Sequence, residues 1–543
     1  MSNGYIDKKF LVIDDFPEFR RLIRRMLESL GIKDIDEDGN GYSVIQKMKA
    51  KAYDIILCDY NLGQGKKDGQ QILEEAKHRG LIRYSTIFIM LTAENTMPMV
   101  MGAVEYQPDD YLIKPITKEI LMRRLEKLTK RKADLEAVEK AIRKNEYTHA
   151  IALCDELVGT NPKNILEYLR LKSELCITVG RYDEANAVFE EVLSMRDITW
   201  AKMGRGKVHF LSGEYLKAQE IFQTITEENK TYMEAYDWLA KALEELGSPE
   251  EARQALIMAT EISPKAILRH QSIGRISYKI EDYDTAEEAF KSAITIGKNS
   301  CFKSPTDYTG LAKALVKKDS SEEALAVLGN ARNEFKGDKE ALLQTVLTEG
   351  IVFKNMNREE EAKKAVQEAA KLSEGLSGKI PVDAAMDMAK ACFEMGEKEA
   401  GMKFVQNVIR NNHDDNKIVR MVRDVFRDAN LEDEGENIIA STRAEILRLN
   451  NEGVGLAESG RLEEAIEYFE KALKGFPENK IINANAAQVL MMHMKKNGKD
   501  DQRLYKVSQY LDRIKKSDPS FDRYRQLLNM YEQITTSGME LKT

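Results

Sequence analysis

Most of this chain takes its fold from one recurring stretch, whose clearest copy reads Gly460-Arg-Leu-Glu-Glu-Ala465-Ile-Glu-Tyr-Phe469-Glu-Lys-Ala472. The small Ala465, the large Phe469 and a second alanine, Ala472, are spaced at i, i+4 and i+7. These three positions share one face of an α-helix, so the helix can approach a partner closely at the small residue. Gly460 is placed to end the preceding helix. The stretch therefore predicts two helices that are joined by a short turn.

The same pattern recurs from about residue 136 to the end of the chain. Two further clear copies read Gly180-Arg-Tyr-Asp-Glu-Ala185 and Gly213-Glu-Tyr-Leu-Lys-Ala218. A helix pair of this size cannot bury its apolar face alone, so neighbouring copies are expected to stack into an array. The small residues of ten successive copies are Ala150, Ala185, Ala218, Ala252, Ala286, Ala324, Ala362, Gly401, Gly435 and Ala465.

This pattern resembles the tetratricopeptide repeat (TPR), a helix–turn–helix unit of about 34 residues. Any α-solenoid would show alternating amphipathic helices, but a spacing of 33 to 35 residues with Gly-x-Tyr-x-x-Ala favours TPR. The resemblance weakens between residues 304 and 442, where Gly401 and Gly435 replace alanine. A last degenerate copy is expected through Tyr510 and Pro519. The resemblance implies an all-α TPR solenoid that binds proteins and carries no chemistry of its own.

The first 130 residues follow a different pattern, in which short apolar runs alternate with helical stripes. Each run is too short for a buried helix and suits a parallel strand that is covered on both faces. Five such strand–helix units predict a doubly wound α/β domain. The runs are Phe10-Leu-Val-Ile13, a weaker one near Ile35, Asp54-Ile-Ile-Leu-Cys58, Thr86-Ile-Phe-Ile-Met-Leu91 and Tyr111-Leu-Ile113.

Chemically active side chains stand where these strands end. Asp14 and Asp15 follow the first strand, and Asp59 follows the third. Because residues past the carboxyl ends of parallel strands converge on one crevice, the three carboxylates need a cation, and hard oxygen ligands suit Mg²⁺. Thr92 and Lys114 end the fourth and fifth strands. A carboxylate nucleophile, a metal, a hydroxyl and an ammonium group are what phosphoryl transfer to an aspartate requires.

Four motifs in this region resemble the receiver domain of bacterial two-component response regulators, and together they cover about residues 7–130. Their order and their places at the strand ends match that domain, which has a flavodoxin-like α/β fold. The motifs are Asp14-Asp15, Leu57-Cys-Asp59-Tyr-Asn61, Leu91-Thr92-Ala93 and Tyr111-Leu-Ile-Lys114-Pro115.

The receiver resemblance implies that Asp59 is the phosphoacceptor. It also implies that Asp14, Asp15 and Asp59 hold Mg²⁺ as the cofactor, with Asn61 adding its backbone carbonyl. The phosphodonor would be a sensor histidine kinase or a phosphotransfer protein. Such a domain is not an enzyme in the ordinary sense, because it catalyses only its own phosphorylation and dephosphorylation.

The same resemblance assigns roles on the last two strands. Thr92 would bond the phosphoryl group, and Lys114 would pair with it. Tyr111 would be the aromatic switch residue that moves when Thr92 is drawn inward. The sequence therefore predicts both a catalytic set and a device for reporting its state.

The loop after Asp59 departs from the receiver pattern. Leu62-Gly63 stands where receivers have Met-Pro, and Asp68-Gly69 lies two residues farther along than usual. Pro108 also stands where small residues are usual. Neither change removes a chemical group, but the longer loop is expected to alter the lifetime of the phosphoryl group.

The acidic cluster and a basic run in the N-terminal region each have a second interpretation. A haloacid-dehalogenase-like phosphotransferase would need an acid/base aspartate two residues after the nucleophile, where this chain has Asn61. A run of six basic residues between positions 123 and 132 would suit contact with a nucleic acid or an acidic partner. The helix that carries the run also has an apolar face, which favours the interpretation that the basic side chains simply face solvent. Met97, Met99 and Met101 are expected to lie partly in the core and partly on a docking face. The basic residues are Arg123, Arg124, Lys127, Lys130, Arg131 and Lys132.

Composition limits the cellular setting. The 543 residues are 43% hydrophobic and 32% charged with a formal net charge of -8, which supports packed cores and argues against a nucleic-acid-coating protein. The five cysteines form no C-x-x-C pair, which favours a reducing cytoplasm. No helix-turn-helix motif follows the receiver region and no apolar stretch is long enough to span a bilayer, so direct DNA binding and membrane insertion are not expected.

We therefore expect a receiver domain over residues 1–131 and TPR-like helices over residues 132–543. Phosphorylation of Asp59 would control the binding of a protein target by the repeats. The alternatives are a phosphate sink or histidine-kinase modulator, a scaffold with a permanently docked receiver, and an indirect regulator of transcription or RNA. The sequence leaves open the target, the cognate kinase, the oligomeric state and the sign of the switch.

Overall fold

The computed structural model of the chain describes residues 5–63, 65–93, 108–373, 380, 382–518 and 521–536. These residues form two compact units. One unit comprises Met1–Ile177 with Arg181–Asp307, and the other comprises Thr178–Gly180 with Tyr308–Thr543. Met97, Met99 and Met101, which were expected to lie partly in the core and partly on a docking face, lie outside the described residues.

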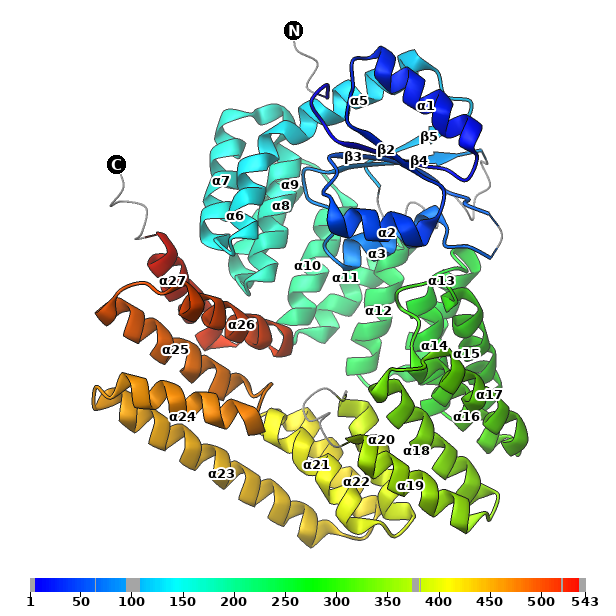
Figure 1. Cartoon of the computed structure of the whole chain (residues 1–543), viewed down its shortest axis with the longest axis vertical. Helices are drawn as coiled ribbons and strands as arrows, with labels where there is room; N and C mark the ends of the chain where they lie inside the picture. The colour runs from blue at the N-terminus through cyan, green and yellow to red at the C-terminus, as the bar shows by residue number, and fades with distance from the viewer. Residues whose placement is uncertain are drawn as a thin grey trace. The chain divides into compact units, whose positions relative to one another are not determined.

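The N-terminal region contains a parallel sheet of five strands in the order β2-β1-β3-β4-β5 (Figure 1). The chain leaves β1 for the edge strand β2 and returns to β3 on the other side of β1, so the sheet is doubly wound. This arrangement confirms the predicted fold class. The strands are β1 (Phe10–Ile13), β2 (Ile35–Asp38), β3 (Ile55–Asp59), β4 (Ile87–Thr92) and β5 (Asp110–Ile113).

Helices cover both faces of the sheet (Figure 1). On one face, α1 (Pro17–Ser29) and α5 (Lys118–Lys132) pack with Phe10 and Val12 of β1. On the other face, α2 (Gly41–Ala50) and α3 (Gly69–His78) pack with the alternate β1 residues Leu11 and Ile13. Both sets of side chains are buried, which is why the strands read as continuous apolar runs.

Helix α5 leads into the repeats through a single turn of 3₁₀-helix, η1 (Ala133–Leu135), followed by α6 (Glu136–Arg143). The basic residues at this junction have local partners. Lys132 Nζ lies 2.7 Å from Asp109 Oδ1, and Arg131 pairs with both Asp109 and Glu167 at 3.3 and 3.2 Å. Arg124 also pairs with Asp110. Three of the six basic residues therefore form ion pairs with nearby carboxylates.

The rest of the described chain is helical, as predicted. The helices after α6 are α7 (Tyr147–Thr160), η2 (Pro162–Asn164), α8 (Ile165–Thr178), α9 (Tyr182–Met195), α10 (Thr199–Leu211), α11 (Tyr215–Glu228), α12 (Met233–Glu245), α13 (Pro249–Ile262), α14 (Ile267–Lys279), α15 (Tyr283–Gly297), α16 (Pro305–Lys317), α17 (Ser321–Glu334), α18 (Lys339–Asn355), α19 (Glu359–Ser373), α20 (Val382–Glu394), α21 (Lys398–Asn412), α22 (Asn416–Asp428), α23 (Glu432–Glu458), α24 (Leu462–Gly475), α25 (Lys480–Asn497), α26 (Asp501–Ser517) and α27 (Asp522–Thr536). In the described residues, no helix has the length and apolar character needed to cross a membrane.

The predicted small residues lie at helix crossings. All ten are buried in the second helix of their pair. In the four copies where the residue four positions later is phenylalanine, its ring meets a glycine on a neighbouring first helix. A Cβ on Gly204 would stand 2.1 Å from the ring of Phe189, and one on Gly206 would stand 2.4 Å from that of Phe222. These glycines let an aromatic ring reach the helix backbone.

A left-handed residue precedes each small residue by five positions. Five of them are the glycines Gly180, Gly213, Gly247, Gly396 and Gly460, with φ between 72° and 80°. The other five are not glycine: Asn145, Glu281, Asp319, Asn357 and Asn430, with φ between 54° and 64°. Asparagine and aspartate tolerate this region better than most residues, so the turn is kept where the glycine signal in the sequence is lost.

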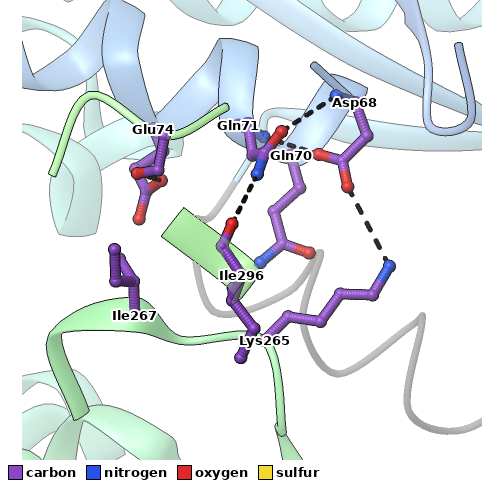
Figure 2. Close-up of a pocket in the computed structure, with 8 residues that line it drawn as sticks. Asp68, Gln70, Gln71, Glu74, Lys265, Ile267 and Ile296 are labelled. Carbon is purple, nitrogen blue, oxygen red and sulfur yellow. Dashed lines mark hydrogen bonds and ion pairs between the residues drawn. The ribbon is translucent and has the colours of Figure 1, made fainter. Parts of the chain in front are cut away.

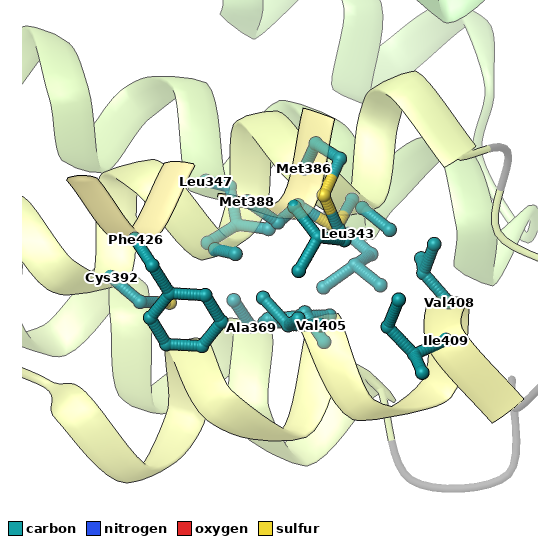
Figure 3. Close-up of a cluster of buried hydrophobic side chains, with 14 of the residues drawn as sticks. Leu343, Leu347, Ala369, Met386, Met388, Cys392, Val405, Val408, Ile409 and Phe426 are labelled. Atoms are coloured by element: carbon teal, nitrogen blue, oxygen red, sulfur yellow. The ribbon is translucent and has the colours of Figure 1, made fainter. Parts of the chain in front are cut away.

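The weaker repeats between residues 304 and 442 have a physical explanation. Their buried side chains form a core across α18 to α23 (Figure 3). A Cβ on Gly401 would stand 2.5 Å from the ring of Phe393, and one on Gly435 would stand 2.7 Å from that of Phe426. Glycine replaces alanine in these two copies because an aromatic ring occupies the space of the methyl group.

Helix α23 belongs to two repeats, a feature that the sequence did not predict. Its 27 residues carry Gly435 near the start, where one copy has its small residue. Near its end, Gly453 faces the ring of Phe469, which belongs to the next copy. The expected last copy is helical, with Tyr510 buried in α26, whereas Pro519 lies outside the described residues.

Candidate functional site

Three carboxylates converge at the carboxyl edge of the sheet. Asp14 and Asp15 follow β1, and Asp59 is the last residue of the adjacent strand β3. Oxygen atoms of the three side chains lie within 4.8 Å of one another. Asp14 and Asp59 are buried and Asp15 is half-buried, so the cluster is largely shielded from water.

Lys114 bridges two of these carboxylates from the end of β5. Its Nζ donates to Asp14 Oδ2 at 2.7 Å and lies 3.0 Å from Asp59 Oδ2. The same ammonium group stands 4.2 Å from the centroid of the Phe19 ring on α1. The contact joins residues 95 positions apart, and no spacing in the sequence predicted it.

Burial dominates the electrostatics of the cluster. It raises the pKa of Asp59 to about 6, against the opposing effect of the bond from Lys114, while the charges of Asp14 and Asp15 raise it further. Burial also acts to lower the pKa of Lys114, but its bonds to Asp14 and Asp59 outweigh this, and the pKa lies above the usual value. The site therefore holds a charged lysine beside a carboxyl group that is costly to ionise.

The donor set fits a hard divalent cation. Asp15 Oδ1 is buried, and no described residue forms a hydrogen bond with it. Three carboxylates with one such oxygen match the ligand preference of Mg²⁺. Asn61 lies in the loop two residues past Asp59, and its side-chain oxygen accepts a bond from Gly63 N at 3.1 Å. Its side chain is thus taken up by the loop, so a metal contact from this residue would come from the backbone carbonyl.

Thr92 and Tyr111 lie on the strands next to the cluster. Thr92 ends β4, the neighbour of β3, and its carbonyl accepts a bond from Lys114 N at 2.8 Å. Tyr111 lies on β5, where its hydroxyl is buried without a hydrogen-bond partner among the described residues. Burial raises the pKa of Tyr111 well above its usual range.

The loop after Asp59 contains two residues with positive φ, Gly63 at 99° and Gly65 at 73°. It returns to the sheet at Gly69, whose N donates to Tyr60 O at 2.9 Å. A Cβ on Gly69 would stand 2.2 Å from Asp59 O. The close approach of α3 to the backbone of Asp59 therefore requires glycine at position 69, while Asp68 caps the start of α3.

Comparison with known proteins matches two kinds of family to different parts of the chain. The response regulator receiver domain family matches residues 10–126, and two tetratricopeptide repeat families match residues 203–267 and 451–479. A chemotaxis protein of Vibrio cholerae, CheY-3, is 25% identical over 123 residues, which are 23% of this chain and 92% of that protein. The chemotaxis protein CheY of Pseudomonas aeruginosa is 25% identical over 123 residues and is covered to 97%.

Solved structures also resemble parts of this chain. A two-component response regulator from Clostridium difficile has 29% identity and a TM-score of 0.21, and covers 23% of this chain and 98% of its own. A tetratricopeptide repeat protein from Parabacteroides merdae has 16% identity and a TM-score of 0.32, and covers 50% of this chain and 98% of its own. The family matches show that the chain carries an N-terminal response regulator receiver domain of two-component signalling, followed by TPR protein-interaction repeats.

Proposed function

We propose that this protein is a phosphorylation-controlled adaptor. Asp59 accepts a phosphoryl group, and its state controls the binding of a protein target by the repeats. The observation that carries the proposal is the buried cluster of Asp14, Asp15 and Asp59, with Lys114 bonded across it. The receiver extends over residues 1–131 and the repeats over residues 132–543.

The transfer step uses groups that already lie side by side. An oxygen of Asp59 attacks the phosphorus of an acyl phosphate or a phosphohistidine; one P–O bond forms, and the bond from phosphorus to the donor breaks with its electrons going to the donor. Asp14, Asp15, Asp59 and the Asn61 carbonyl would hold Mg²⁺, which neutralises charge on the transferred group. Lys114 orients that group, and Thr92 donates a hydrogen bond to it.

The output step depends on the strands beside the cluster. The Thr92 hydroxyl moves toward the phosphoryl group, and Tyr111 fills the space that it leaves. The unpartnered hydroxyl of Tyr111 supports this role, because no hydrogen bond among the described residues holds it in place. The continuous path from α5 through η1 to α6 supports transmission to the first repeat.

Labelling with acetyl phosphate in the presence of Mg²⁺ tests the site. Wild-type protein is expected to be labelled, Asp59→Asn to lose the label completely, and Asp15→Ala to be labelled weakly because it loses a metal ligand. Asp38→Asn is a matched control, because Asp38 ends the edge strand β2 outside the cluster. Full labelling of Asp59→Asn would contradict the proposal.

Partner capture tests the output. Proteins bound by the repeats in a cytoplasmic extract, including sensor kinases, are compared with and without acetyl phosphate. A change in the affinity of a captured target supports the adaptor. Labelling of Asp59 with no change in the affinity of any target would favour a phosphate sink or kinase modulator.

A further inference from the structure

The turn between α15 and α16 contacts the receiver through Asn299. The Asn299 Nδ2 donates to Gly65 O at 3.1 Å, and its Oδ1 accepts from Tyr42 OH at 2.8 Å. Gly65 belongs to the loop after Asp59, and Tyr42 begins α2. Both side-chain hydrogen bonds of Asn299 thus go to the receiver and not to its own repeat.

Lys67 holds the same contact from the receiver side. Its Nζ donates to Asn299 O at 2.6 Å and pairs with Glu75 Oε2 at 2.6 Å. The Lys67 side chain is only 2% exposed. A buried ammonium group is costly unless it is both paired and hydrogen-bonded, and here the repeat supplies one of the two partners.

Helix α3 extends this contact (Figure 2). Gln71 Nε2 donates to Ile296 O at 3.4 Å, and Lys265 Nζ lies 3.9 Å from Asp68 Oδ2. Figure 2 shows Lys265 and Ile296 on the repeat side facing Asp68, Gln71 and Glu74 of the receiver. Glu74 is 6% exposed and Gln70 is 4% exposed, values that are unusual for such polar side chains.

Aromatic packing completes the contact. The rings of His78, at the end of α3, and Phe302 meet edge to face, with centroids 4.7 Å apart. Ser300 Oγ donates to Glu74 Oε2 at 3.4 Å. The contact therefore combines hydrogen bonds, the partly exposed ion pair of Lys265 with Asp68 and one aromatic pair, and it involves one face of α3 along its whole length.

We infer that residues 296–302 with Lys265 form a docking surface for the chain's own receiver. This surface responds to the conformation of the loop after Asp59. The loop leaves the acidic cluster at Asp59 and passes Gly63, where a Cβ would stand 3.5 Å from Asp15 Oδ2. It then reaches Gly65 and Lys67, which bond to Asn299. One short loop thus contacts both the acidic cluster and the repeats.

This contact gives a second route from Asp59 to the repeats, separate from the junction through α5. The docking contact is inferred from the contacts of Asn299 and Lys67 and does not rest on the proposed function, whereas its coupling to Asp59 does. If phosphorylation of Asp59 changes the equilibrium constant for docking, then docking must change the equilibrium constant for phosphorylation of Asp59 by the same factor. The two additional residues in the loop, noted as a departure from the receiver pattern, lie in the segment that Asn299 contacts.

Hydrogen exchange of the unphosphorylated full-length protein tests docking. Asn299→Ala removes two hydrogen bonds to the receiver, so amides of α3 and of residues 296–302 are expected to exchange about 5- to 100-fold faster than in wild type. Lys298→Ala is the matched control, because Lys298 is exposed on the same turn and has no ion pair with a described residue. Lys265→Glu, which places a negative charge near Asp68, is expected to act like Asn299→Ala. Unchanged exchange in both variants would overturn the docking surface.

Labelling and exchange together test the coupling. Acetyl phosphate with Mg²⁺ is expected to change exchange at residues 296–302 by about 5- to 150-fold in wild type. Asn299→Ala is expected to change the fraction of Asp59 that is labelled at equilibrium with fixed concentrations of acetyl phosphate and acetate, relative to Lys298→Ala. Equal labelled fractions in these two variants, with exchange at residues 296–302 unaffected by phosphorylation, would overturn the coupling. Absence of labelling in wild type would instead contradict the proposed function, while exchange in Asn299→Ala would still decide the docking.

Discussion

The acidic cluster and the repeat crossings both depend on glycines that allow a close approach, but the approaching groups differ. At Gly69 the neighbour is a backbone atom, Asp59 O, which would lie 2.2 Å from a Cβ. At Gly204 the neighbour is the ring of Phe189, which would lie 2.1 Å from a Cβ. A ring can rotate or be replaced, whereas the strand that carries Asp59 cannot move without displacing the site. Similar distances are therefore expected to have different consequences.

The largest expected effect is that of Gly69→Ala. Its methyl group would collide with the backbone of β3, so we expect a loss of about 3 kcal/mol or more in receiver stability. Labelling of Asp59 should fall together with it, because the strand end would be displaced. The stability is measured by hydrogen exchange of the β3 and α3 amides in the full chain. Retention of both wild-type labelling and exchange would show that the strand can yield as easily as a ring.

A second test compares two buried carboxyl groups. Burial raises the pKa of Asp307 to about 6, as it does for Asp59, but Asp307 has Gln271 and Ser304 as its hydrogen-bonding partners in place of a lysine. Since the folded-state pKa lies above the unfolded value, the folded chain binds more protons between about pH 4 and pH 6. The contribution of Asp307 to the free energy of unfolding is therefore largest at low pH. It is lost as the pH rises through 6, by at most about 3 kcal/mol.

Urea unfolding at pH 5 and pH 7.5 measures this difference. Asp307→Asn cannot ionise, so the part of the pH dependence that comes from this group should disappear, and the variant should gain on wild type as the pH rises. A pH dependence that is the same in wild type and Asp307→Asn would contradict the prediction.

Gly204→Ala tests the repeat crossing. We expect a loss of about 1–3 kcal/mol, because the methyl group overpacks the contact with Phe189. Phe189→Leu in the same chain should recover part of the loss by shortening the opposing side chain. Gly159→Ala is the control: nothing lies within 4 Å of its Cβ position in α7, so it should gain about 0.5–1 kcal/mol. Urea midpoints of the variants provide the comparison.

The smallest effect is expected at the left-handed turns. Gly460→Ala places a Cβ at φ 80° and should cost about 1–2 kcal/mol. Asn357→Gly, at the equivalent turn with φ 57°, should change stability by only a few tenths, because asparagine already tolerates this conformation. A gain of about 1–2 kcal/mol in Asn357→Gly would instead show that this non-glycine turn is strained.

The sequence alone determined the two fold classes and the membership of the acidic cluster. Alternation of apolar runs and helical stripes predicted the doubly wound sheet, and a period near 34 residues predicted the helix pairs. The ends of parallel strands share one edge of the sheet, so the sequence could predict that four side chains lie close together: Asp14, Asp15, Asp59 and Lys114. Local patterns suffice wherever one rule of geometry fixes where a side chain lies.

Only the tertiary structure decided which residues from distant parts of the chain meet. The contact of Asn299 with Gly65 joins positions 234 residues apart, and neither residue stands in a recurring pattern. The role of Gly401 likewise depends on the ring of Phe393, which packs against it from the preceding helix. Such contacts follow from the way whole helices and loops pack, and no periodicity in the sequence encodes them, because each occurs only once and depends on the positions of many other elements.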